Sequence, residues 1–117
     1  MRKIELNYGN ISEVRQLPIH DAELLDISCD YKNYAVHIYL SLDSPRKKNI
    51  KAQLSLFGVK LLNIPIDEPW GVGKYLNEVT GDMKEPQNIN LLFNLKVLLN
   101  SGDEILVIAK ELVYNEG

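Results

Sequence analysis

The fold is decided by residues 22–42, which read AELLDISCDYKNYAVHIYLSL. From residue 25 the apolar residues of the first half occupy odd positions, and those of the second half occupy even positions. This alternation with a period of two predicts two β-strands. A two-residue turn at Lys32-Asn33, with Asn33 in the left-handed conformation, would join them into a hairpin.

This turn determines which residues face each other across the hairpin. Each apolar residue meets another apolar residue on one face, which we expect to be buried. A slip of one residue would turn Asp26 and Asp30 into the core, so the register is strongly specified. The predicted apolar pairs are Tyr31 with Tyr34, Cys29 with Val36, Ile27 with Ile38, and Leu25 with Leu40.

Two further regions show strand alternation. Residues 50–61 predict a middle strand, in which a change of phase at Gly58 indicates a bulge. Residues 89–99 and 104–114 predict a second hairpin around the turn Asn100-Ser101-Gly102-Asp103. Alternation in the last strand is weak, so we expect both of its faces to be covered, either by short helices or by a second copy of the chain in a homodimer.

The rest of the chain adds short elements. Residues 4–8 alternate as a brief strand, and Ile11 and Val14 predict a helix of about two turns. The spacing of residues 75–79 predicts a second short helix that ends at Gly81. The expected fold class is α+β, a mainly antiparallel sheet of about five strands with two short helices. All 117 residues are expected to form one domain.

Composition restricts the class of protein. The formal net charge of −3 argues against a dedicated nucleic-acid binder, in spite of the basic cluster Arg46-Lys47-Lys48. The single cysteine, Cys29, cannot form an internal disulfide and lies on the apolar face of the predicted hairpin, which suits a reducing compartment. No stretch reads as a signal peptide or a membrane span, so we expect a cytoplasmic protein.

Polar side chains gather on the outer face of the predicted hairpin. Ser28 lies opposite His37, and two carboxylates are diagonal neighbours of this imidazole. Such a group can orient a general base, bind a metal or bind a cationic side chain. Solvent-exposed strands, however, also carry such residues without any functional role. A flat sheet offers an interface without a cleft, so we interpret the group as a protein-binding patch. Its expected partner-binding residues are Asp26, Asp30, His37 and Tyr39.

A second candidate site surrounds His20 and Asp21. A metal-dependent phosphohydrolase would need further histidine ligands, and the chain has only two histidines. We expect Asp21 to cap the turn into the hairpin, and His20 to pack beside Trp70 or to bond to backbone. The run Gly71-Val72-Gly73-Lys74 is too short for a phosphate-binding loop. The sequence therefore predicts no catalytic residue, no cofactor and no metal ligand.

A short motif carries a family resemblance. The run LPIHDAELL at residues 17–25 resembles a family of small bacterial immunity proteins from polymorphic toxin systems, whose members carry a similar His-Asp-Ala-Glu run at the entrance to their first strand. LFGV at residues 56–59 and PWG at residues 69–71 are similar to features of related small bacterial proteins, some of them encoded in toxin clusters. The resemblance implies a non-enzymatic protein that neutralises a toxin by binding it.

Two functions follow from these observations. The first is a cytoplasmic immunity protein that binds a basic toxin domain, because opposite charges steer association. It would use the outer sheet face or an acidic edge comprising Asp21, Glu23, Asp26 and Asp30. The second is a small enzyme or ligand-binding domain with a pocket near His20, Asp21 and Trp70. A neighbouring gene for a large secreted toxin would favour the first, and a small molecule bound in that pocket would favour the second.

Overall fold

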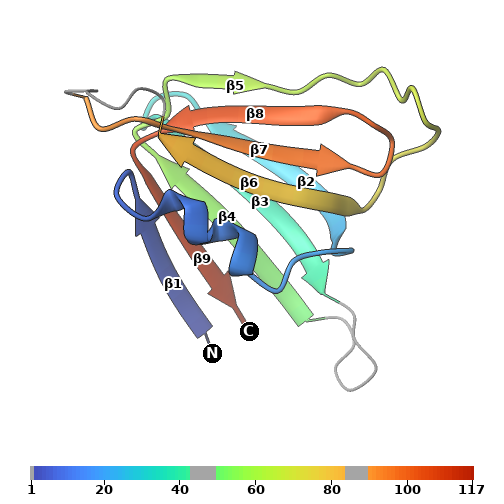
Figure 1. The fold of residues 1–117 in the computed structure, drawn as a ribbon, viewed down its shortest axis with the longest axis horizontal. Coiled ribbons are helices and arrows are strands. Elements are labelled where there is room, and N and C mark those ends of the chain that lie inside the picture. The colour runs from blue at the N-terminus through green and yellow to red at the C-terminus, as the bar shows by residue number, and fades with distance from the viewer. Residues whose placement is uncertain (1, 43–49, 84–89) are drawn as a thin grey trace.

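The computed structural model describes residues 2–42, 50–83 and 90–117. They form a sandwich of two antiparallel β-sheets whose strands cross obliquely (Figure 1). The large sheet has the order β1-β9-β4-β3-β2, and the small sheet has the order β5-β8-β7-β6. The strands are β1 (Arg2–Asn7), β2 (Glu23–Asp30), β3 (Ala35–Leu42), β4 (Ile50–Phe57), β5 (Leu61–Asn63), β6 (Leu76–Met83), β7 (Phe93–Leu99), β8 (Glu104–Ala109) and β9 (Glu111–Glu116).

The predicted α+β class, with about five strands and two short helices, is wrong. The described residues form nine strands, and their one helical element is the short 3-10 helix η1 (Ile11–Gln16). The second predicted helix is strand β6. A bulge between Leu76 and Glu78 leaves Leu76 and Val79 buried with two exposed polar residues between them. The bulge therefore gives the buried residues Leu76 and Val79 the three-residue spacing that is typical of a helix.

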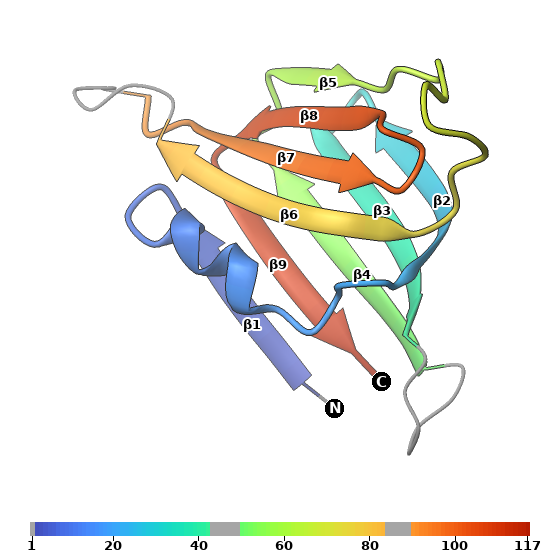
Figure 2. The ribbon, with the colours of Figure 1, turned by 45° about the vertical axis from the view of Figure 1, so that its right-hand side comes forward.

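Helix η1 closes one side of the sandwich, between β1 and β6 (Figure 2). Its buried residues Ile11 and Val14 pack against β6 at Gly81. A Cβ added to Gly81 would lie 2.7 Å from both the carbonyl oxygen and the Cγ1 of Ile11. The glycine predicted to end a helix is thus the point at which a strand makes room for η1.

The chain passes between the sheets at two adjacent corners. Strand β4 ends at Phe57, and after Gly58, whose φ is 65°, the chain enters the small sheet as β5. Strand β8 ends before Lys110, after which the chain returns to the large sheet as β9. The Lys110 N–H donates to the Phe57 carbonyl oxygen (3.0 Å), and a Cβ on Gly58 would lie 3.0 Å from the Lys110 Cβ. The two corners therefore support each other.

These corners correct two sequence predictions. The phase change at Gly58 marks passage to another sheet, not a bulge within one strand. The single strand predicted for residues 104–114 is two strands, with Ile105 buried in the small sheet and Leu112 buried in the large sheet. Alternation is weak over residues 104–114 because the buried residues have odd numbers on β8 and even numbers on β9. The homodimer suggested by that pattern stays a prediction.

The first hairpin follows the predicted register over most of its length. A bulge between Leu24 and Asp26 shifts the pairing, so Leu24 lies opposite Leu40 and the predicted partner Leu25 is 45% exposed. The predicted pairing is therefore wrong at this end only. The pairs observed as predicted are Cys29 with Val36, Ile27 with Ile38, Ser28 with His37, and Asp26 with Tyr39.

The tip of this hairpin differs in two details. The Tyr34 N–H donates to the Tyr31 carbonyl oxygen (3.3 Å), which centres the turn on Lys32-Asn33 as predicted. The left-handed residue, however, is Tyr34, with φ 54°, and not Asn33. Cys29 is exposed and not in the core, because β2 is an edge strand of the large sheet.

The core lies between the two sheets and under η1. Its largest fully buried side chains include Tyr114, Phe93, Ile11, Ile19, Ile38, Leu40, Leu54 and Leu56. The predicted basic loop at residues 43–49 and the predicted start of a strand at Ile89 lie outside the described residues. Within the described ranges, no helix is both long and apolar enough to cross a membrane.

Candidate functional site

The outer face of the large sheet presents its side chains in rows that follow the strand register. The central row runs from Ser28 through His37, Ser55 and Val113 to Glu5. The two flanking rows are Asp26-Tyr39-Gln53-Asn115-Lys3 and Asp30-Ala35-Phe57-Glu111-Asn7. We call these three rows the His37 surface. The patch predicted on the first hairpin is one end of it.

A hydrogen-bond network holds His37 at the centre of this surface. Its Nδ1 lies 2.9 Å from Ser55 Oγ and 3.1 Å from Gln53 Nε2. Gln53 Nε2 also donates to Ser55 Oγ at 2.8 Å. Because an amide nitrogen is a donor, this contact favours the tautomer of His37 with its proton on Nε2. The ring therefore has an N–H that can donate to a partner.

Two aromatic rings flank the imidazole. The Tyr39 ring centroid lies 6.3 Å from that of His37, and the Phe57 ring lies 6.1 Å away in an edge-on arrangement. Phe57, Gln53 and Ser55 are members of the site that the sequence pattern did not predict. Their alternation placed them on a middle strand, but it did not show that this strand pairs with β3.

The two carboxylates predicted beside His37 also have local structural roles. Asp26 Oδ1 accepts a hydrogen bond from the Ile27 N–H at 2.8 Å. Asp30 accepts from the Asn33 N–H at 3.3 Å and from Asn33 Nδ2 at 2.8 Å. The side-chain bond from Asn33, followed by its backbone bond, lowers the pKa of the Asp30 carboxyl below its ordinary value. Asp30 thus stabilises the turn, and both acids form a charged margin of the surface.

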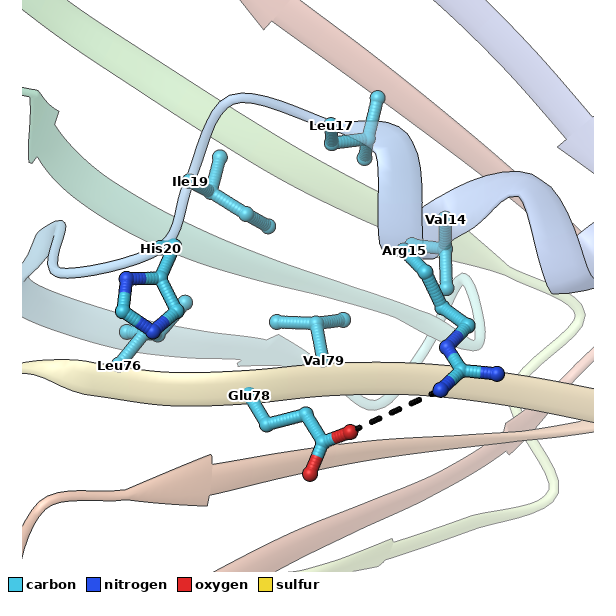
Figure 3. Close-up of a pocket in the computed structure, with 8 residues that line it drawn as sticks. All are labelled: Val14, Arg15, Leu17, Ile19, His20, Leu76, Glu78 and Val79. Carbon is cyan, nitrogen blue, oxygen red and sulfur yellow. Dashed lines mark ion pairs between the residues drawn. The ribbon is translucent and has the colours of Figure 1, made fainter.

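The second predicted site contains a small pocket between η1 and β6 (Figure 3). The His20 ring lies at one end of this pocket of about 140 Å³, and the Arg15–Glu78 ion pair (3.9 Å) lies at the other. Asp21, at φ 64°, donates its N–H to the Leu76 carbonyl oxygen and places its carboxylate 3.1 Å from His20 Nδ1. Asp21 therefore orients the imidazole at the rim. The apolar lining is Val14, Leu17, Ile19, Leu76 and Val79.

Trp70 is not among the residues that line this pocket. Its backbone N–H donates to the Ser101 carbonyl oxygen (2.8 Å). Its ring packs on Gly102, where an added Cβ would lie 2.7 Å from Trp70 Cδ2. The indole covers the β7–β8 turn and is 66% exposed. The structure thus brings His20 and Asp21 together, and places Trp70 on a different turn.

A buried carboxylate without a predicted role holds the segment before Trp70. Asp103 accepts hydrogen bonds from the backbone N–H groups of Asp67 (2.8 Å) and Glu68 (2.9 Å), and from Ser101 Oγ (2.8 Å). The bond from Asp67, followed by those from Glu68 and Ser101, lowers the pKa of Asp103 and outweighs the effect of burial. Its role is structural, because these donors occupy both carboxylate oxygens.

The described residues contain no group of three or more His, Cys, Asp or Glu side chains placed to hold a metal ion. Comparison with protein-family models and with curated proteins finds no match to this sequence. The function is therefore argued from the geometry of the two sites.

Proposed function

We propose that this chain is a non-enzymatic binding protein of immunity type, which neutralises a basic toxin domain by contact with the His37 surface. The observation that carries this proposal is the pre-organised centre of that surface, where Ser55 and Gln53 hold His37 between Tyr39 and Phe57. Side chains that are already fixed lose little rotamer freedom on binding. Aromatic residues at the centre of a flat surface are typical of protein interfaces.

The charges around this centre favour a basic partner. Lys3 and Glu5 pair with each other at 3.3 Å and contribute no net charge. The other charged side chains on the three rows, or on the neighbouring row Glu23-Ser41-Lys51, are Asp26, Asp30, Glu111, Glu23 and Lys51. Four acids against one base leave the surface acidic, in agreement with the net charge of −3 for the chain. Such a surface attracts a basic domain and repels an acidic one.

The alternative of a small enzyme has weaker support in the His20 pocket. Its polar side chains already contact one another, Arg15 with Glu78 and His20 with Asp21. No side chain there is both free and placed as a nucleophile beside a base, as covalent catalysis requires. We propose the cytoplasm as the compartment, because Cys29 is exposed and free.

The direct test uses the toxin domain that immunity function requires. The probe is the C-terminal domain of a secreted toxin encoded beside this gene, and calorimetry measures its dissociation constant with the full chain. We expect Tyr39→Ala and His37→Ala each to weaken binding about ten-fold or more, as central interface residues do. Binding should also weaken as salt is added, because the acidic margin is exposed.

Thr80→Ala is the matched control, since Thr80 lies on β6 in the small sheet and not on the His37 surface. It should leave the dissociation constant unchanged. Circular dichroism should show that all three variants keep their strands. Equal binding by the wild type and the two His37-surface variants would refute this assignment of the surface. Failure of the chain to bind a neighbouring toxin domain would refute the immunity function.

A further inference from the structure

A second hollow lies on the open side of the sandwich, between the tip of the first hairpin and strand β5. Its volume is about 280 Å³. Apolar and aromatic side chains provide most of its lining: Cys29, Tyr31, Tyr34, Val59, Leu61 and Leu62. We call this hollow the Tyr34 groove. It adjoins the His37 surface, with which it shares Asp30 and Ala35, while Cys29 alternates with Ser28 and Asp30 along β2.

The backbone holds Tyr34 at the rim in an unfavourable conformation. A φ of 54° is uncommon for a bulky residue, and such conformations persist only where the surrounding structure enforces them. Here the Tyr34 carbonyl oxygen accepts a hydrogen bond from the Val59 N–H at 2.9 Å. Tyr34 nevertheless stays 60% exposed, and Tyr31 is 87% exposed. Two aromatic side chains are thus held at the mouth of an apolar hollow.

Two charged side chains, Lys60 and Asp30, line the groove. Lys60 Nζ lies 5.6 Å from the centroid of the Tyr34 ring. Within the part of the chain that the structure describes, no carboxylate pairs with Lys60. The acid that lines the groove is Asp30, and Asn33 already donates to both of its carboxylate oxygens. Among the described residues that line the groove, Lys60 is therefore the charged group without an ionic or hydrogen-bonded partner, and a ligand carboxylate can pair with it.

We propose that the Tyr34 groove binds a compact amphipathic carboxylate, with its apolar body against Cys29 and Leu61 and its carboxylate on Lys60. The volume lies just below the range of about 300–1,000 Å³ that is usual for small-molecule sites, which limits the ligand to a compact one. A free aliphatic acid and the C-terminal residue of a peptide share this chemistry. The proposal does not depend on toxin binding at the His37 surface.

Cys29 provides a local measurement, since it is the only cysteine, is exposed and lines the groove. The experiment follows its alkylation by N-ethylmaleimide in the full chain, with octanoate, octanol or octylammonium present. Octanoate should slow the reaction several-fold and octylammonium less, because Lys60 pairs with the anion, whereas both oxygens of Asp30 already accept hydrogen bonds from Asn33. Circular dichroism at the same concentrations should show an unchanged fold.

Two variants test the groove without disturbing the core. Lys60→Met should weaken octanoate binding about three- to five-fold, as expected for an exposed ion pair, and leave octanol binding unchanged. Tyr34→Gly removes one wall while it relieves the positive φ, so it should lower octanoate affinity and keep the fold. The matched control is Lys96→Met on β7 of the small sheet, which should behave as wild type.

A pair of peptides distinguishes the two sources of the carboxylate. Calorimetry compares octanoate with N-acetyl-glycyl-leucine and with its C-terminal amide. Tighter binding of the peptide acid than of octanoate and the amide identifies a peptide terminus, whereas tighter binding of octanoate identifies a free acid. Equal protection of Cys29 by octanoate, octanol and octylammonium would overturn the proposal. Unchanged octanoate binding in Lys60→Met and Tyr34→Gly would also overturn it.

Discussion

The packing of η1 on β6 predicts a measurable effect of a single methyl group at Gly81. In Gly81→Ala the new Cβ would lie 2.7 Å from the carbonyl oxygen of Ile11, a backbone atom that cannot move without the helix. Overpacking of this kind costs roughly 1–3 kcal/mol, whereas the loss of glycine freedom in the unfolded chain returns roughly 0.4–1 kcal/mol. We expect a net loss of about 1–2 kcal/mol. Urea unfolding should then show a midpoint lower by about 0.5–1 M.

Gly9→Ala is the matched control for this measurement. The nearest atom to its added Cβ is Asn7 Oδ1 at 3.4 Å, an ordinary contact, so stability should stay level or rise slightly. Ile11→Ala combined with Gly81→Ala should cost less than the sum of the single changes, by about 0.5 kcal/mol or more, because part of the clash is gone. Gly81→Ala with the same midpoint as Gly9→Ala would show that η1 does not pack on β6 at this position.

Three further predictions concern single residues. Asp103 has a lowered pKa, so it stabilises the fold at pH values above the ordinary aspartate pKa, and this stability is lost as pH falls through the folded pKa. Asp103→Asn should therefore lower the urea midpoint at neutral pH, and the difference from wild type should shrink in acid; a difference independent of pH would contradict this. Tyr34→Gly should increase the free energy of unfolding by up to about 1 kcal/mol, because glycine adopts φ 54° without strain. Its melting temperature should therefore rise. A lower melting temperature would mean that the ring contributes more than the strain costs. Asp26→Ala should increase self-association in sedimentation experiments, because Asp26 covers the Ile27 N–H on the edge of β2. An unchanged monomer fraction would show that another feature protects this edge.

The sequence was sufficient for structure that depends on local alternation. The pairing of Ser28 with His37 follows from a period of two on both strands and from one turn, and the structure has it. The left-handed residue was misassigned, because propensity favours Asn33 while the bond between the Tyr34 carbonyl and the Val59 N–H selects Tyr34. Local preference therefore located the turn, and a tertiary contact decided its conformation.

The sequence was insufficient for structure that depends on which sheet a strand joins. A phase change at Gly58 is consistent with a bulge and with a crossing between sheets, and no nearby residue separates the two. For the same reason the corner at Lys110 was not predicted. Its backbone N–H donates to the carbonyl oxygen of Phe57, a residue far away in the sequence. Because strand neighbours were unknown, Ser55 and Gln53 could not be placed beside His37. The site was thus predicted only as far as one hairpin extends.

The register of the first hairpin produces both surfaces proposed for this protein. On β2, Ser28 faces the His37 surface and Cys29 lines the Tyr34 groove, while Asp30 lies at the margin that the two share. Successive residues of a strand point to opposite faces, so a slip of one residue would exchange the two sets. The bulge before Asp26 lies at the far end of the strand and leaves this order intact. The Asn33 bonds to Asp30 hold the register at the tip, so the turn that closes the hairpin also fixes which residues of β2 face the acidic protein-binding surface and which line the apolar groove.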